Sequence, residues 1–198
     1  MVRPECAALE LWNSRGWNGT SCEGGAFLIL IKSACMTRVG VRDAAIFTEG
    51  IFYESNRSSQ TDRKLMERVK GRALYHPSEL VRNAASAGEA RITQNFAQFY
   101  SDPFVIESFP GLSIDFILSL HRALGAPRFV EIVSRFARDP YVYRSGWPDL
   151  TLVSGTKLKL REVKTLNDEV RDSQNRLATD ILLPLGIDVA VSRLTGGV

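Results

Sequence analysis

The chain contains few residues that could bind a soft metal or form a disulfide bond. It has three cysteines and two histidines, and they share no metal-binding spacing. We therefore expect neither a zinc site nor a disulfide framework, and this cysteine usage fits a reducing compartment. The residues concerned are Cys6, Cys22, Cys35, His76 and His121.

Long apolar runs, repeats and low-complexity tracts are also missing. The longest apolar run, residues 26–31, is far shorter than the roughly 20 residues of a membrane-spanning helix, and we expect neither a signal peptide nor membrane association. Hydrophobic residues make up 44% and charged residues 24% of the 198 residues, which is typical of one globular domain. The net charge of +3 is compatible with nucleic acid binding but does not by itself indicate it.

Residues 149–164 have the pattern of a β-hairpin. An apolar, β-favouring run at 149–153 and an alternating run at 158–163 flank Ser-Gly-Thr, which is hairpin turn chemistry. Asp149 then heads one strand, and Glu162 and Lys164 lie near the end of its partner. Residues two apart on a strand share a face, so Glu162 and Lys164 point the same way and Val163 points into the core. An antiparallel pairing brings Asp149 beside them.

The rest of the chain predicts mainly helices. Apolar spacing and breaks at Pro or Gly place a turn at 16–19, a last strand at 187–194, and helices at 6–13, 62–72, 77–85, 89–99, 112–124, 128–137 and 175–183. We expect a single domain, with a helix-rich section at about 1–138 and a β-hairpin core at about 139–198. The aromatic residues Phe96, Phe99 and Tyr100 fit a packed core better than a surface for stacking bases.

Two carboxylates and an ammonium on one side of a small sheet suit phosphodiester hydrolysis. Oxygen ligands hold a hard divalent cation such as Mg²⁺, and a nearby lysine can orient or deprotonate the attacking water. The alternative is that Asp149 caps a turn while Glu162 and Lys164 form an exposed ion pair. These three residues alone favour that alternative.

The surrounding sequence changes this balance. Ser-Gly-Trp-Pro-Asp-Leu at 145–150 is followed by Arg-Glu-Val-Lys at 161–164, by Asn-Asp at 167–168, and by Gln174, ten residues after the lysine. In this order and at these intervals, the motifs resemble the VRR-NUC branch of the PD-(D/E)xK nucleases. The resemblance implies an α/β fold with a restriction-endonuclease-like core, a small mixed sheet flanked by helices, here preceded by a helix-rich N-terminal section.

The resemblance also implies roles for individual residues. Asp149 and Glu162 would bind Mg²⁺ or Mn²⁺ together with the backbone carbonyl of Val163. Lys164 would assist catalysis. Gln174 matches the glutamine that opens the helix after the hairpin and would support the site.

Glu23 allows two interpretations. Thr20 or Ser21 could cap a buried helix that runs to about Cys35, with Glu23 as the acidic residue of a capping box. However, Trp-x-x-x-x-Cys-Glu-Gly at 17–24, before an apolar helix, resembles the start of the nuclease module of Fanconi-associated nucleases. That resemblance implies that Glu23, on this helix, completes the metal site.

Arg138, Arg144 and Arg161 lie near the hairpin in sequence. Each could belong to a solvated charged face, or together they could form a basic rim that positions a nucleic acid backbone. Beside a site that cleaves phosphodiesters, the second interpretation is at least as good, and we expect these arginines to contact nucleic acid.

The resemblance implies a structure-selective DNA nuclease, with 5′ flap endonuclease and 5′-to-3′ exonuclease activity in DNA repair such as interstrand crosslink repair. Expected partners are branched or flapped DNA and DNA-repair proteins, in the nucleus of a eukaryote or otherwise in the cytoplasm. Two alternatives stay open: a phage-type VRR-NUC Holliday junction resolvase, and an inactive DNA-binding module of the same fold. Fanconi-associated enzymes are longer, with further regions ahead of the nuclease module, whereas this chain resembles only that module.

Overall fold

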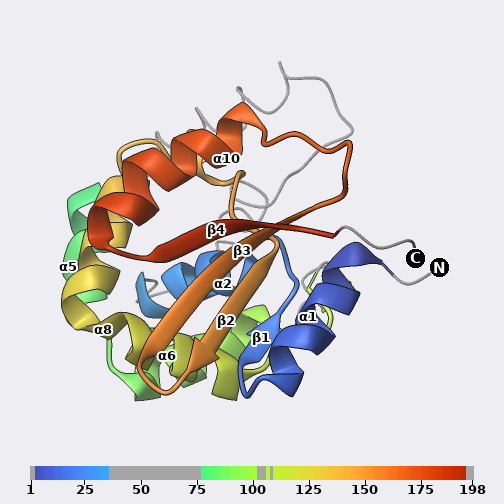
Figure 1. The fold of residues 1–198 in the computed structure, drawn as a ribbon. Helices are drawn as coiled ribbons and strands as arrows, with labels where there is room; N and C mark the ends of the chain where they lie inside the picture. The colour runs from blue at the N-terminus through green and yellow to red at the C-terminus, as the bar shows by residue number, and fades with distance from the viewer. Residues whose placement is uncertain (1–2, 36–76, 102–105, 108, 195–198) are drawn as a thin grey trace.

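A mixed four-stranded sheet forms the centre of the fold (Figure 1). The computed structural model describes residues 3–35, 77–101, 106–107 and 109–194. The strands lie side by side in the order β1 (Asn18–Thr20), β2 (Leu150–Ser154), β3 (Lys157–Lys164) and β4 (Asp188–Arg193). The pairs β1–β2 and β2–β3 are antiparallel, and the pair β3–β4 is parallel. This mixed sheet with flanking helices confirms the predicted fold class.

The predicted hairpin is the β2–β3 pair. Its register runs from Leu150 opposite Arg161 to Ser154 opposite Lys157, which leaves a two-residue turn at Gly155 and Thr156. Gly155 has φ 58°, a conformation that suits tight hairpin turns and favours glycine. One further step along this register places Asp149 opposite Glu162.

Helices cover both faces of the sheet. The larger core lies between one face and the helices α2 (Gly25–Cys35), α5 (Pro77–Ala85), α6 (Glu89–Phe99) and α8 (Ile114–Phe136). A smaller core lies on the opposite face, where α1 (Pro4–Ser14) packs over Leu150, Leu152 and Val163. Every residue of α2 is buried, as expected of a helix whose first seven residues are all apolar or glycine, and its polar residues Lys32 and Ser33 are buried as well.

The last segments of the chain return from β3 to β4. The connection contains α10 (Asp172–Leu177), a π-helical turn η2 (Ala178–Leu182) and a 3-10 turn η3 (Leu183–Leu185). Figure 1 shows α10 above the upper end of the sheet, at the end of β3 that is farther from the hairpin turn. The helix predicted at 175–183 therefore begins three residues earlier and changes its winding at Ala178.

Most predicted helices are confirmed. The two helices predicted at 112–124 and 128–137 form one element, α8, broken at Gly125, whose φ of 71° and ψ of 155° are not helical. Pro127 lies two residues after Gly125, and proline suits the first turn of the second half of α8. Phe96 and Phe99 are buried, which confirms that they belong to the core.

Two elements were not predicted, and part of the helical section cannot be assessed. β1 lies where only a turn was expected, and α9 (Pro140–Tyr143) is a four-residue helix just before the hairpin. A strand as short as β1 has no detectable alternation, and it exists because β2 offers an unpaired edge. Residues 36–76 of the predicted helical section, including the helix predicted at 62–72, lie outside the described residues.

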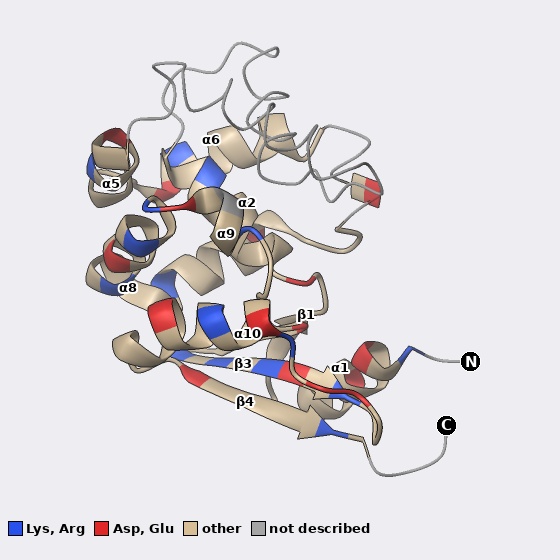
Figure 2. Cartoon of the chain, turned by 90° about the horizontal axis from the view of Figure 1, so that it is seen from above, with Lys and Arg blue, Asp and Glu red and all other residues tan. Residues whose placement is uncertain are grey.

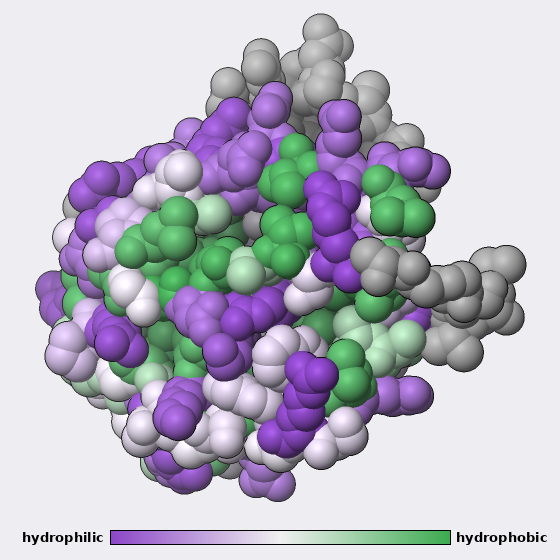
Figure 3. Space-filling model, viewed as in Figure 1, coloured by the Kyte–Doolittle hydropathy of each residue, from purple (hydrophilic) through white to green (hydrophobic). Residues whose placement is uncertain are grey.

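Polar and apolar side chains are interspersed on the face of the molecule shown in Figure 3. No helix in the described ranges is long and apolar enough to cross a membrane.

The buried contacts of α8 should dominate stability. Ile132 has no exposed surface, so Ile132→Ala should lower the free energy of unfolding by about 2–5 kcal/mol because it leaves a cavity. Leu183→Ala is the control: Leu183 is 54% exposed, and its removal should change stability by less than about 0.5 kcal/mol. Urea unfolding measures both, and equal effects would contradict this assignment of the core.

Candidate functional site

The hairpin brings Asp149, Glu162 and Lys164 together, as the sequence predicts. The backbone N–H of Val163 donates to Oδ2 of Asp149 at 2.7 Å, which ties the start of β2 to the end of β3. Lys164 Nζ lies 2.8 Å from Oε1 of Glu162. Glu162 and Lys164 are only 5% and 7% exposed, so they form a buried ion pair and not the exposed surface pair of the alternative interpretation.

Gln174 holds the Glu162 carboxylate from the start of α10. Its Nε2 donates to Oε1 of Glu162 at 2.5 Å, and its own Oε1 accepts from the backbone N–H of Arg171 at 2.8 Å. The amide is fixed at both ends and fixes Glu162 in turn. Oε1 of Glu162 thus has two donors, whereas Oε2 is buried without a hydrogen-bond partner among the described residues.

The turn before β2 is shaped by a close approach to α10. Gly146 has φ 89°, and a Cβ at this position would clash with the backbone carbonyl of Ser173. Only glycine allows this contact, which sets Asp149 close to Gln174. Figure 2 shows acidic and basic residues meeting where the end of β3 lies beside the start of α10.

Glu23 lies in a turn before α2 and not on the helix. Its φ is 41°, the one positive value outside glycine among the described residues, and α2 begins two residues later at Gly25. The capping-box position is the third residue inside a helix, so the predicted capping role is wrong, as is the placement on the helix. A left-handed φ at a residue other than glycine costs free energy and is concentrated at functional sites.

The turn that contains Glu23 and Gly24 packs against the side chain of Trp147. Gly24 has φ 83°, and a Cβ at this position would clash with the Trp147 side chain. Trp147 also stacks on Phe27 at 4.5 Å between ring centroids and donates from Nε1 to the backbone carbonyl of Tyr143 at 2.9 Å. Because Trp147 precedes Asp149 by two residues, this packing couples the position of Glu23 to that of Asp149.

One cleft of about 610 Å³ contains all of these groups. The residues Asp149, Glu162, Val163, Lys164 and Gln174 line it, and so does Glu23, whose charge acts on Asp149. Three arginines also line it, namely Arg3, Arg144 and Arg171. Arg144 was predicted at the site, whereas nothing in the local sequence pattern pointed to Arg3 or Arg171.

Two of the arginines predicted to contact nucleic acid do not line this cleft. Arg138 is exposed elsewhere. Arg161 is 7% exposed and lies on the other face of the sheet, where it pairs with Oδ1 of Asp188 at 2.8 Å and packs 5.5 Å from the Trp12 ring. The physical reason is strand alternation, because Arg161 precedes Glu162 by one residue and must face the opposite way.

The electrostatics of the cleft favour a cation. The pKa of Asp149 is raised to about 7: burial is the largest cause, the negative charges of Glu162 and Glu23 act in the same direction, and the hydrogen bond from the Val163 N–H acts against them. Two facing carboxylates, one with an unpartnered buried oxygen, form a donor set that suits a hard divalent cation. The cluster is incomplete, however: among the described residues no three His, Cys, Asp or Glu side chains are placed to hold a metal ion together.

The VRR-NUC domain model matches residues 85–194, which is more than half of the chain and includes β2, β3, α10 and β4. The chain belongs to the VRR-NUC domain family. This match confirms the family that the sequence motifs predict. No curated protein matches the chain.

Two solved structures share the fold of this VRR-NUC domain. One is the crystal structure of paFAN1 bound to 2-nt 5′ flap DNA with a gap, with a TM-score of 0.64. The other is paFAN1 bound to 1-nt 5′ flap DNA with a gap, with a TM-score of 0.60. Each is 20% identical in sequence, and the match covers 100% of this chain but 36% of paFAN1. The chain thus spans about a third of the length of these proteins.

The raised pKa of Asp149 predicts a pH-dependent stability. Without metal, the folded carboxyl keeps its proton up to a pH of about 7, whereas the unfolded one releases it near 3.8. Stability therefore falls as the pH rises through this window. Asp149→Asn removes the ionisation but keeps an acceptor for the Val163 N–H.

We expect Asp149→Asn to melt at a higher temperature than the wild type in EDTA at about pH 8, with the difference shrinking towards about pH 4. Mg²⁺ should raise the melting temperature of the wild type more than that of the variant. A difference in melting temperature that does not vary with pH would contradict the raised pKa.

Proposed function

We propose that this VRR-NUC domain is a metal-dependent, structure-selective DNA nuclease with 5′ flap endonuclease and 5′-to-3′ exonuclease activity. The observation that carries the proposal is the cleft in which Asp149, Glu162, Lys164 and Gln174 converge with Glu23. A merely structural role would not require a buried carboxylate oxygen without a partner beside a second carboxylate. The same intact set argues against an inactive DNA-binding module.

The proposed cofactor is Mg²⁺ or Mn²⁺. Asp149 and Glu162 would hold it, with the backbone carbonyl of Val163 and with Glu23, either directly or through water. When bound, the cation would neutralise charge that develops on the phosphate and lower the pKa of the attacking water. Cys22 is the one Cys or His among the described residues that line the cleft, and burial raises the pKa of its thiol, so the donor set favours these hard cations over zinc.

The surrounding side chains have distinct proposed tasks. The Val163 N–H orients the Asp149 carboxylate, and Gln174 orients that of Glu162. Lys164, whose Nζ lies 2.8 Å from Glu162, would orient the attacking water or, once deprotonated, accept its proton. The cleft arginines would contact the backbone phosphates of a bound strand.

The flap substrate is supported by likeness, because the paFAN1 structures that share this fold hold 5′ flap DNA. A role in DNA repair such as interstrand crosslink repair, association with DNA-repair proteins, and a nuclear location in a eukaryote (cytoplasmic otherwise) extend the same proposal. The phage-type resolvase is the contrasting activity, so a Holliday junction is the comparison substrate for each assay below.

Asp149→Ala should abolish cleavage of a labelled 5′ flap in Mg²⁺ and leave DNA binding largely intact, because it removes a proposed metal ligand and no phosphate contact. EDTA should block the wild type, and Ca²⁺ should support binding with little turnover. Single-turnover cleavage and anisotropy binding measure the two properties. If Asp149→Ala cleaves the flap at the wild-type rate, or if the wild type is fully active in excess EDTA, the proposal is wrong. If the wild type cuts a Holliday junction faster than a flap, the resolvase activity is favoured instead.

Glu23→Gln tests the residue that comes from outside the hairpin. The change keeps the shape of the side chain but removes a negative charge that faces the cleft and acts on Asp149. We expect cleavage of the 5′ flap to fall by orders of magnitude at an unchanged melting temperature, with partial recovery at high Mn²⁺. A rate within about threefold of wild type, well under 1 kcal/mol of barrier, would remove Glu23 from the site.

A further inference from the structure

A second cleft, of about 230 Å³, lies at the turn end of the hairpin. It shares no lining residue with the first cleft. Four separate parts of the chain form it: the segment before β1, the second half of α8, the hairpin turn with the start of β3, and the start of β4. Its polar and aromatic lining residues are Trp17, Arg128, Thr156, Lys157, Lys159 and Asp188.

The charge of this second cleft is positive. Its one carboxylate, Asp188, is already engaged by two cations: Oδ2 lies 2.6 Å from Lys159 Nζ, and Oδ1 lies 2.8 Å from Arg161. These contacts, that of Arg161 first, lower the pKa of Asp188 to about 2, so the carboxylate stays ionised and matched. Arg128 and Lys157 are both exposed, and neither side chain has a hydrogen bond or an acidic partner within the part of the chain that the structure describes.

An aromatic pair lies beside these cations. Trp17 packs edge-to-face on Trp12, with 5.9 Å between ring centroids, and Lys159 Nζ lies 5.3 Å from the Trp17 ring. Trp17 is half-buried and lines the cleft. Cationic donors beside an aromatic edge suit a polynucleotide strand, because phosphate takes the donors and sugar or base packs on the ring.

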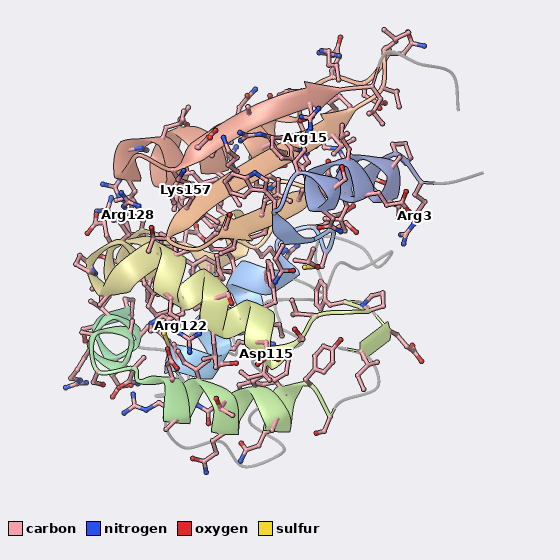
Figure 4. All side chains as sticks on the ribbon, turned by 60° about the horizontal axis from the view of Figure 1, so that its bottom comes forward. Arg3, Arg15, Asp115, Arg122, Arg128 and Lys157 are labelled. Carbon is pink, nitrogen blue, oxygen red and sulfur yellow. The ribbon has the colours of Figure 1, made fainter. Side chains whose placement is uncertain are left out.

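We propose that this second cleft binds the backbone phosphates of DNA whose scissile region occupies the first cleft; the proposal rests on the proposed nuclease function. Arg128 and Lys157 make the charged contacts, and Thr156 offers its hydroxyl. Such contacts fix the position of a duplex arm and carry no base specificity. Figure 4 shows Arg128 and Lys157 at the same end of the molecule, opposite to the end that carries Arg3.

The spacing of the two clefts sets a length requirement. Lys157 and Glu162 are five residues apart on β3, which corresponds to about 17 Å of strand. Because this spacing is odd, the side chains of Lys157 and Glu162 point to opposite faces of the sheet, and about 17 Å is the shortest separation along the protein. Duplex DNA rises about 3.4 Å per base pair, so an arm must extend more than about five base pairs from the cleavage position before it can reach the second cleft. Affinity should therefore rise with arm length across this threshold.

The test compares two double variants with equal loss of charge. Arg128→Ala with Lys157→Ala removes the proposed contacts. Arg82→Ala with Arg122→Ala is the matched control, because both arginines are exposed on the surface but paired with Glu79 and Glu89. Binding of 5′ flap DNA is measured by fluorescence anisotropy in EDTA, with each duplex arm set in turn to about 4 and about 15 base pairs.

We expect the Arg128 and Lys157 variant to bind the long-armed DNA about tenfold more weakly than wild type and the short-armed DNA equally well. For this variant, the plot of log affinity against log salt concentration should be less steep by about 1.8, because each of the two lost phosphate contacts contributes about 0.9 to the slope. The control variant should bind both DNAs as the wild type does. Melting temperatures of both variants show that they are folded.

The inference is overturned if the two double variants weaken binding equally, or if wild-type affinity does not depend on arm length. These readouts do not need cleavage. A protein that shows the arm-length effect but cuts no DNA in Mg²⁺ would refute the nuclease proposal and keep the second cleft. A protein that cuts flaps but whose affinity does not depend on arm length would support the nuclease proposal and refute the second cleft as a DNA-binding site.

Discussion

The structure depends on one cross-strand relation, the position of Asp149 opposite Glu162. The hairpin register makes them neighbours, and the 2.7 Å hydrogen bond from the Val163 N–H fixes the carboxylate of Asp149 in place. The buried carboxylate of Glu162 and the half-buried one of Asp149 repel each other, so the fold must supply groups that compensate. Lys164 and Gln174 supply them on one oxygen of Glu162, and the other oxygen has no hydrogen-bond partner among the described residues.

Each neighbouring element serves this arrangement through a contact that few other residues would permit. Gly146 lets the turn before β2 touch the start of α10, and Gly24 lets the Glu23 turn rest on Trp147. Both glycines have positive φ, and at both positions a Cβ would collide with the partner. Residues from far apart in the chain therefore meet at the cleft by backbone packing, before any cation is considered.

Much of the fold and of the candidate site could be predicted from the sequence because it depends on local residue patterns. The hairpin follows from alternation and turn chemistry, and α6 occupies the range predicted for it. The sheet face on which Arg161 lies could also have been predicted, because the alternation that puts Glu162 and Lys164 on one face puts Arg161 on the other. What could not be predicted depends on distant contacts. The positive φ of Glu23 is set by packing on Trp147, and β1 exists because β2 has an edge to pair with.

The alternating charges of β3 also protect the fold against misassembly. Lys159 and Arg161 face Asp188 and the tryptophans, while Glu162 and Lys164 face the cleft. A slip of β3 by one residue would turn every side chain to the opposite face. Glu162 would then face Asp188 with like charge, and Arg161 would enter the wall that now holds Asp149 and Gln174. The residues proposed for catalysis thus also penalise the wrong strand register, so selection for the site would at the same time maintain correct folding.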